Sequence, residues 1–276
     1  MAFRRTLLIR RSVTARRIRY AAPALEKGLD ILELLASVSE ALTHSEIASR
    51  LGRSITEVFR MLVCLEERGY ISRTTPEERY QLTLKLFELV HHHHPLQRLV
   101  TQARPLVQRV ASETGQSCHV AMLNNAEVVL VAQADAPGNV GFSVRLGANI
   151  DLLNTASGHV ILAFQSEEVR TRALAAWRLR SRKPIPTGLF RHLNQIRRRG
   201  FEELASYQVH GVVNISYPVL NQHGEAIAAM TVPFLARIGD SLGPPQVKEA
   251  LSQAARALSL TIGGGRPELT SGAVLP

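Results

Sequence analysis

The segment Thr43–Tyr70 reads THSEIASRLGRSITEVFRMLVCLEERGY and predicts two helices joined by a tight turn. Thr43 and Ser54 each stand three residues before a glutamate, which is the spacing of a capping box at a helix start. Gly52 follows the first helix at a position that favours a left-handed backbone. One face of the second helix is apolar, formed at steps of three and four by Ile55, Val58, Met61, Leu62 and Leu65. The pattern is that of a DNA-binding helix-turn-helix, and an ordinary helical hairpin is the alternative.

The sequence on both sides extends this segment to a winged helix. Pro23–Ser39 predicts a supporting helix that starts with proline. Two strand-like pieces at residues 70–73 and 79–84 flank a turn, which predicts a β-hairpin wing with Arg73 and Arg79 at its sides. A helix, a helix-turn-helix and a wing in this order indicate DNA binding more specifically than any one of them does.

The chain of 276 residues is long enough for two domains and carries a formal net charge of +10. Residues 1–22 contain seven arginines and no acid, whereas residues 23–80 contain seven basic and ten acidic residues, a net charge of −3. Ten further bases lie within residues 170–199. We interpret residues 1–22 as a flexible basic arm that contacts phosphates; a transit peptide and a translation start placed too early are the alternatives.

The sequence gives no sign of a membrane span, a disulfide framework or a catalytic nucleophile pair. No apolar run has the length of a membrane span, and Cys64 and Cys118 fall in apolar patterns typical of reduced thiols in a cytoplasmic protein. On a strand, Cys118 and His119 point to opposite faces, which does not suit a nucleophile pair. We therefore expect no catalytic residues and no cofactor. The run His91–His94 is interpreted as a polar domain junction, with a metal site on His91 and His94 as the alternative.

The second half of the chain predicts an α+β fold with an antiparallel sheet. Residues 23–84 form the predicted winged helix, residues 85–99 a linker helix, residues 100–262 a second domain and residues 263–276 a disordered tail. Within the second domain the expected strands are 117–123, 127–133, 140–145, 211–220 and 226–234, and the expected helices are 99–114, 155–164, 167–177, 186–199 and 245–263. Strands that pair mainly as hairpins favour an antiparallel sheet.

The exposed N-terminal part of the second helix of the helix-turn-helix is expected to face base edges. The candidates are Ser54, Thr56, Glu57 and Arg60. Arginine can bind guanine through two hydrogen bonds, glutamate can accept one from cytosine, and threonine can contact a thymine methyl group. Phosphate contacts are expected from Thr43 and Arg53, and wing contacts from Arg73 and Arg79. A solvated helix face is the alternative for each.

A second candidate site begins at Asn154, where the sequence NTASG opens a helix. Asn154 or Thr155 can cap this helix, and the small residues Ala156, Ser157 and Gly158 leave backbone amides uncovered, which suits a carboxylate. Alternation along one hairpin strand places three side chains on one face, and the partner strand adds a fourth; these are Val212, Asn214, Ser216 and Thr231. The pattern predicts a small-molecule cavity; a filled core with capping and sheet-satisfying polar residues is the alternative.

Seven stretches at matching spacings resemble the IclR family of bacterial transcription regulators. They are PALEKGLDILELLA (23–36), SEIASRLGRSITEVFRMLVCLEERGYI (45–71), YQLTLKLFEL (80–89), ETGQSCHVAML (113–123), VRLG (144–147), LNTASGHVILA (153–163) and GVVNISYPVLNQHGEAIAAMTV (211–232). The resemblance implies a GAF-like effector-binding second domain, a small metabolite as effector, and a homodimer or homotetramer. It also implies ligand-contacting positions at Phe142, Ala156, Ser157, Val212, Asn214 and Thr231.

The chain departs from this family pattern near the expected cavity. Asn154 and His159 stand where the family often has histidine and lysine, and Tyr207 stands where it often has an acidic residue. Known ligands of the family are therefore not transferred. We expect a ligand-responsive regulator that binds a double-stranded DNA operator and a small organic acid, with the linker helix relaying the effector's influence. The alternatives are an architectural DNA-binding protein whose second domain only oligomerises, and a cytosolic enzyme with a tethered winged helix.

Overall fold

The structure is a computed structural model that describes residues 22–74, 77–91, 94–238 and 242–262. The predicted arm, apart from Ala22, and the predicted tail lie outside these ranges, as do the side chains of the histidine run 91–94. The chain divides into two compact units, Met1–His92 and His93–Pro276, each of which is described by itself. The division falls inside the predicted linker, and α5 begins at His94, whereas the sequence predicted a helix start at Leu99.

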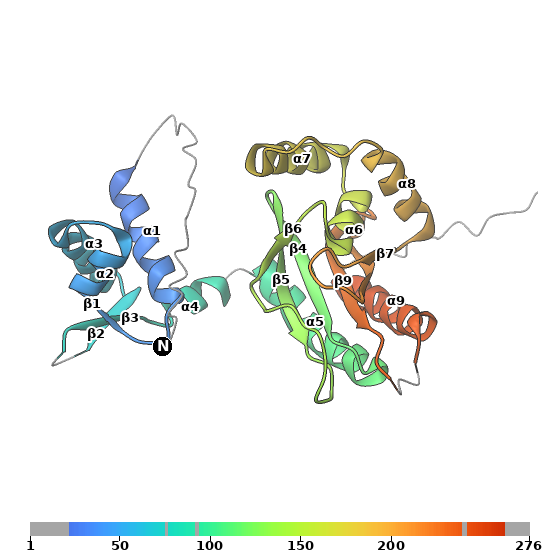
Figure 1. Cartoon of the computed structure of the whole chain (residues 1–276), viewed down its shortest axis with the longest axis horizontal. Helices are drawn as coiled ribbons and strands as arrows, with labels where there is room; N and C mark the ends of the chain where they lie inside the picture. The colour runs from blue at the N-terminus through green and yellow to red at the C-terminus, as the bar shows by residue number, and fades with distance from the viewer. Residues whose placement is uncertain (1–21, 75–76, 92–93, 239–241, 263–276) are drawn as a thin grey trace, which may run out of the picture. The chain divides into compact units, whose positions relative to one another are not determined.

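The first unit is a winged helix, as the sequence predicted (Figure 1). Its elements are α1 (Pro23–Ala36), β1 (Leu42–Thr43), α2 (His44–Leu51), α3 (Ile55–Glu67), β2 (Ile71–Thr74), β3 (Arg79–Leu82) and α4 (Lys85–His91). The strands form an antiparallel sheet in the order β1-β3-β2, in which β1 was not predicted. Both capping boxes are confirmed, and Gly52 ends α2 with a left-handed φ of 63°.

The core of the first unit lies between α1, α2, α3 and the sheet. Val58 and Leu62 of α3 are buried in it, and Met61 and Leu65 pack at its edge. The assignment of Ile55 to the inner face was wrong, because this residue at the start of α3 is 52% exposed. Ile55 instead continues an exposed apolar stripe with Phe59 and Val63, one helical turn apart.

The second unit contains a six-stranded antiparallel sheet in the order β6-β5-β4-β9-β8-β7. Its elements are α5 (His94–Thr114), β4 (Cys118–Asn124), β5 (Glu127–Ala134), β6 (Asn149–Asp151), α6 (Ala156–Phe164), α7 (Glu167–Ser181), α8 (Leu189–Arg199), β7 (Glu202–Ala205), β8 (Val212–Leu220), β9 (Ala226–Leu235) and α9 (Pro244–Thr261). The α+β class and the antiparallel sheet are thus confirmed. None of the helices in the described ranges is long and apolar enough to cross a membrane.

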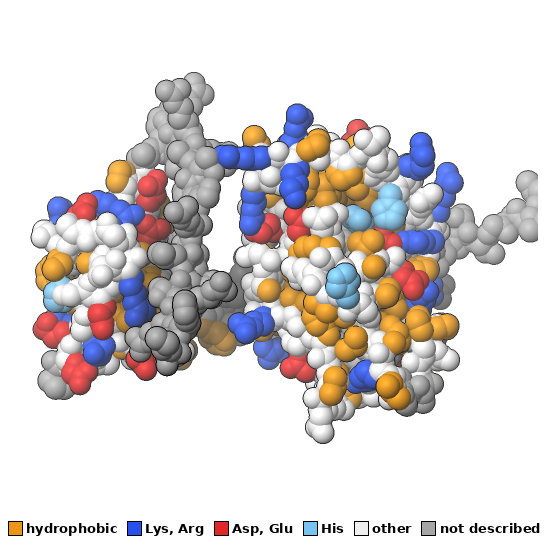
Figure 2. All heavy atoms as spheres, viewed as in Figure 1, with side chains coloured by type: hydrophobic (Ala, Val, Ile, Leu, Met, Phe, Trp, Pro, Cys, Tyr) orange, Lys and Arg blue, Asp and Glu red, His pale blue; other side chains and the backbone are white. Residues whose placement is uncertain are grey.

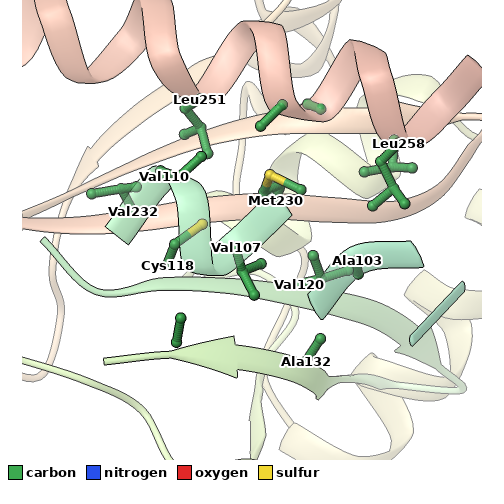
Figure 3. Close-up of a cluster of buried hydrophobic side chains, with 14 of the residues drawn as sticks. Ala103, Val107, Val110, Cys118, Val120, Ala132, Met230, Val232, Leu251 and Leu258 are labelled. Atoms are coloured by element: carbon green, nitrogen blue, oxygen red, sulfur yellow. The ribbon is translucent and has the colours of Figure 1, made fainter. Parts of the chain in front are cut away.

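Helices cover both faces of this sheet (Figure 1). On one face, α5 and α9 close a core that includes Val107, Cys118, Met230 and Leu251 (Figure 3). On the other face, α6 packs over β8 and β9, α8 packs against α6, and α7 contributes Trp177 to the second core. Strand β4 is therefore buried on both sides. Cys118 lies in the first core and His119 on the α6 face, so the two point to opposite faces of the strand, as predicted.

Two elements of the sheet differ from the sequence prediction. The strand predicted at residues 140–145 was wrong: the chain runs there as a loop, and the sheet edge is formed by β6, which pairs with β5 from Asn149 onward. Gly138, Gly141 and Gly147 lie in this loop, and glycine disfavours a regular strand. At the opposite edge, β7 was not predicted and pairs with β8.

The basic residues between positions 170 and 199 belong to α7, α8 and their connection. Figure 2 shows lysine and arginine side chains along the part of the second unit where α7 and α8 lie in Figure 1. Some of these bases are paired within the unit: Arg180 contacts Glu127, and Arg199 contacts Glu202. The surface formed by these two helices is positively charged.

Candidate functional site

A row of five polar side chains crosses the sheet of the second unit. In the strand register, Gln133 is opposite His119, His119 is opposite Thr231, Thr231 is opposite Ser216, and Ser216 is opposite Glu202. Directly opposite residues of antiparallel strands project from the same face, here the face covered by α6. All but Gln133 are at least nine-tenths buried. We call these five residues the polar row.

Three hydroxyl groups meet at the middle of the polar row. The Oγ1 atom of Thr231 lies 2.8 Å from Ser216 Oγ and 2.9 Å from Ser157 Oγ, so β9, β8 and the first turn of α6 each contribute one group. All three residues were predicted as site residues, and the structure brings them together. A hydroxyl can donate and accept, so this cluster can bind either kind of polar atom.

The N-terminus of α6 opens beside this cluster and is capped by Thr155. The Thr155 Oγ1 accepts a hydrogen bond from the Gly158 amide at 3.2 Å, so that amide is not free for a ligand. The amides of Ala156 and Ser157 donate no hydrogen bond to any residue in the described ranges, and both residues are buried. Two free amides at a helix N-terminus, where the helix dipole is positive, favour an anion.

Two of the predicted residues have another evident role at this helix. Gly158 allows α6 to approach the chain before it, because a Cβ there would clash with the Leu152 carbonyl oxygen and lie 2.8 Å from its carbon. Asn154 is exposed, and its side chain donates to Asp151 Oδ1 at 2.9 Å. Asn154 therefore shapes the turn before α6, and Thr155 is the cap.

The remaining predicted residues lie on β8 and in the loop between β5 and β6, and they are buried to different extents. Val212 and Asn214 share the face of β8 with Ser216, and Val212 is buried while Asn214 is partly buried. Phe142 lies half-buried in the loop between β5 and β6. The alternation predicted for β8 is therefore present.

His119 is a site candidate that the sequence reasoning missed. It is 4% exposed, and its Nε2 has no hydrogen-bond partner among the described residues. Burial lowers the pKa of His119 to about 4, so the ring is neutral at pH 7. The Oε1 atom of its neighbour Gln133 is also buried and unpartnered within the described part of the chain. Alternation along the strand predicted that His119 lies on the face opposite to Cys118. Only the pairing of β4 with β9 puts His119 beside Thr231.

Glu202 ends the polar row at the sheet edge. Burial raises its pKa, but hydrogen bonds from His159 and the Glu203 amide, with the charges of His192 and Arg199, outweigh that effect. The pKa of Glu202 therefore lies below its ordinary value, and the side chain is a carboxylate at neutral pH. Neither His159 nor His192 was predicted as a site residue, because these two and Glu202 come from three separate elements.

In the first unit, Thr56 and Arg60 lie on the exposed face of α3. Neither side chain makes a hydrogen bond or ion pair with another residue in the described ranges, so both are available to a partner. The exposed Ile55 and Phe59 flank them on the same helix. This face offers one cation, one hydroxyl and apolar surface, which suits base edges and thymine methyl groups.

The other predicted DNA contacts are paired within the first unit. Ser54 and Glu57 form the capping box of α3, and Lys27 donates to Glu57 at 2.5 Å. The hydrogen bonds from Lys27 and Ser54 lower the pKa of Glu57 to about 2. Arg53 pairs with Asp30 at 2.5 Å.

Thr43 and the two wing arginines are likewise engaged. Thr43 forms the capping box of α2 with Glu46, whose carboxylate also pairs with Arg79 at 3.3 Å. Arg79 contacts Glu77 at 2.8 Å, and Arg73 contacts Glu78 at 3.2 Å. These groups would have to exchange or share their partners to bind phosphate.

Comparisons with known proteins cover both units. The family described as the bacterial transcriptional regulator IclR C-terminal domain matches residues 91–260, and the IclR helix-turn-helix domain matches residues 24–75. The HTH-type transcriptional regulator BhcR of Paracoccus denitrificans is 30% identical over 242 residues, which are 86% of each chain.

Solved structures share the fold. The IclR of Thermotoga maritima has a TM-score of 0.68 and 26% identity, over 87% of this chain and 98% of that one. An IclR homolog from Microbacterium hydrocarbonoxydans, complexed with 4-hydroxybenzoate, has a TM-score of 0.70 and 23% identity over the same shares.

Proposed function

This chain belongs to the IclR family of bacterial transcriptional regulators, and we propose that a small organic acid is the effector to which it responds. As a member of this family it is a ligand-responsive, DNA-binding regulator with an N-terminal helix-turn-helix and a C-terminal effector-binding domain. We place it in the cytoplasm, where its DNA target lies. We likewise propose where the acid binds and which residues contact DNA.

The buried N-terminus of α6 is the observation that supports an organic acid as the effector. The free amides of Ala156 and Ser157 would bind the carboxylate, as helix N-termini bind anions in other proteins. The hydroxyls of Ser157, Ser216 and Thr231 and the neutral ring of His119 would bind the remainder of the molecule. The complex of the Microbacterium homolog with 4-hydroxybenzoate, itself a small organic acid, supports this class of ligand.

On the DNA side, α3 would enter the major groove with Thr56 and Arg60 at base edges. Binding as a dimer to a palindromic operator is supported by exposed apolar side chains on α1 and α4. These are Leu25, Leu29, Leu86, Phe87 and Leu89. Regulation requires that the effector bind one arrangement of the two DNA-binding units more tightly than another.

Ligand-induced stabilisation tests the site directly. Purified full-length protein is screened by thermal shift against small organic acids and the corresponding primary amides. An acid at 100 times its Kd should raise the free energy of unfolding by about 2.7 kcal/mol, while the uncharged amide should do so much less. Thr231→Val should weaken binding at least about tenfold, because the acid loses the Thr231 hydroxyl and the Ser157 and Ser216 hydroxyls lose the group that positions them.

Thr261→Val is the matched control, since Thr261 is an exposed residue at the end of α9. It should leave the effect of the acid unchanged. Equal stabilisation by acids and amides would contradict the carboxylate site, and equal loss in both valine variants would contradict the role of Thr231.

A further inference from the structure

The geometry points to a binding site for one divalent transition-metal ion at His159, His192 and Glu202. These residues come from α6, α8 and β7, and one ligand atom of each lies within 4.8 Å of the others. His159 Nδ1 is 3.4 Å from Glu202 Oε2, and His192 Nε2 contacts the same oxygen. A tetrahedral metal with ligands at about 2.0–2.2 Å holds their atoms about 3.3–3.6 Å apart. Shifts of about 1 Å would therefore seat the ion.

The hydrogen bonds of His159 prepare it to act as a ligand. Its Nε2 lies 2.9 Å from the Leu153 carbonyl oxygen, which can only accept, so Nε2 carries a proton. Nδ1 faces Glu202 Oε2 and hydrogen-bonds it here, and a bound metal ion would take the place of the Nδ1 proton. Metal-binding histidines in other proteins usually donate their second N–H to a carbonyl or carboxylate in this way.

The carboxylate of Glu202 is oriented in a similar manner. Its Oε1 accepts hydrogen bonds from Arg199 and, at 2.8 Å, from the Glu203 amide. These bonds leave Oε2 as the atom that faces both imidazoles. The side chain is 1% exposed, so a cation bound there would pair with a largely desolvated carboxylate.

The ligand set indicates the kind of metal. Two imidazoles and one carboxylate favour Zn²⁺ and its first-row neighbours over Mg²⁺ and Ca²⁺, which prefer oxygen ligands. Three protein ligands leave a fourth position for water or another ligand, as in open zinc sites. His192 is 36% exposed at its side chain, which gives the ion a route from solvent.

The same three groups can also be held together by protons alone. The Nδ1–H of His159 and the Nε2–H of His192 would then donate to Glu202 Oε2, and Arg199 would donate to Oε1. The two arrangements differ in whether the chain binds a metal, and titration with Zn²⁺ distinguishes them. The test uses neither effector nor DNA, so its outcome is independent of the proposed function.

The experiment measures Zn²⁺ binding to the full-length protein after chelation and dialysis. The histidines 91–94 can bind metal themselves, so all measurements use a background in which His91, His92, His93 and His94 are changed to glutamine. Zn²⁺ is titrated by calorimetry and in competition with a chromophoric chelator. Co²⁺ is added separately, because its visible absorption reports the coordination geometry. We expect one Zn²⁺ per chain and an intense, tetrahedral-type Co²⁺ spectrum.

Two ligand variants and one control decide the assignment. His192→Ala, at a half-exposed position, should weaken Zn²⁺ binding at least about tenfold and remove the Co²⁺ spectrum, as should His159→Gln. His223→Ala, in the exposed turn between β8 and β9, should change neither measurement. Absence of Zn²⁺ binding by the background, or binding that His192→Ala leaves intact, would overturn the site.

Discussion

At the scale of single residues, the winged helix separates side chains that hold it together from those free to bind. Glu57 illustrates the difference, because it caps α3 and pairs with Lys27, so its oxygens are already occupied. Arg60, one turn further along α3, is exposed and makes no ion pair with another described residue. Sequence discrimination should therefore depend on Arg60 more than on Glu57.

Arg60→Ala should relax the preference for one base pair of the operator and weaken specific binding by about 1–3 kcal/mol. The reason is the loss of a bidentate contact to a base edge. Gel shifts on the operator and on single-base variants measure the effect. Arg68→Ala, at the C-terminal cap of α3, is the control and should leave the preference unchanged. Uniform weakening across all operator variants would mean that Arg60 contacts only phosphate.

Gly158→Ala should destabilise the second unit by about 1–3 kcal/mol or more, because a Cβ at this position clashes with the backbone of Leu152. Chemical denaturation followed by the fluorescence of Trp177, in the same unit, measures the change. Gly138→Ala is the matched control: no atom lies within 4 Å of a Cβ at that position, so the shift should stay within about 0.5 kcal/mol. Similar stability of the two variants would show that α6 can move away from Leu152.

At the scale of elements, local signals predicted the helices and hairpins well. Capping residues located the starts of α2, α3 and α6, and alternation located β8 and β9. The edge strands β6 and β7 were not predicted, because short edge strands depend on their partner strand more than on their own sequence. The polar row depends on register across five strands, which no local pattern encodes. Three of its members, Gln133, His119 and Glu202, were therefore missed.

His119, on the central strand β4, should make the free energy of unfolding depend on pH. Its folded pKa of about 4 lies below the unfolded value of 6.5, so the unfolded chain binds more protons between these values. The contribution is complete above pH 6.5 and is lost as pH falls toward 4; it amounts to about 3 kcal/mol at most.

Urea denaturation between pH 7 and pH 4 tests this linkage. The free energy of unfolding should fall less steeply with decreasing pH in His119→Gln than in the unchanged protein, since glutamine does not titrate. The carboxylates that titrate in the same pH range contribute equally in both chains, so their contribution cancels in the comparison. Parallel pH profiles would show that His119 is protonated in the folded protein as readily as in the unfolded chain.

At the scale of the whole molecule, the two units perform separate tasks that must be coupled for regulation. The first unit has the exposed face of α3, and the second has the buried α6 terminus and its hydroxyls. Because coupling between two binding equilibria is reciprocal, an acid that changes operator affinity must itself be bound more or less tightly when operator is present. The factor is the same in both directions, and in other regulators it is typically about 5–150-fold.

This reciprocity predicts the behaviour of Thr231→Val. Operator affinity is measured by fluorescence anisotropy with and without a saturating acid, and acid affinity is measured with and without operator. Both ratios should agree in the unchanged protein and in the control Thr261→Val. At an acid concentration that saturates the unchanged protein, the operator ratio of Thr231→Val should approach one, because the variant binds the acid poorly. If that ratio stays unchanged while the acid is bound weakly, the regulatory acid occupies another site, and the hydroxyl cluster serves only the packing of α6 on the sheet.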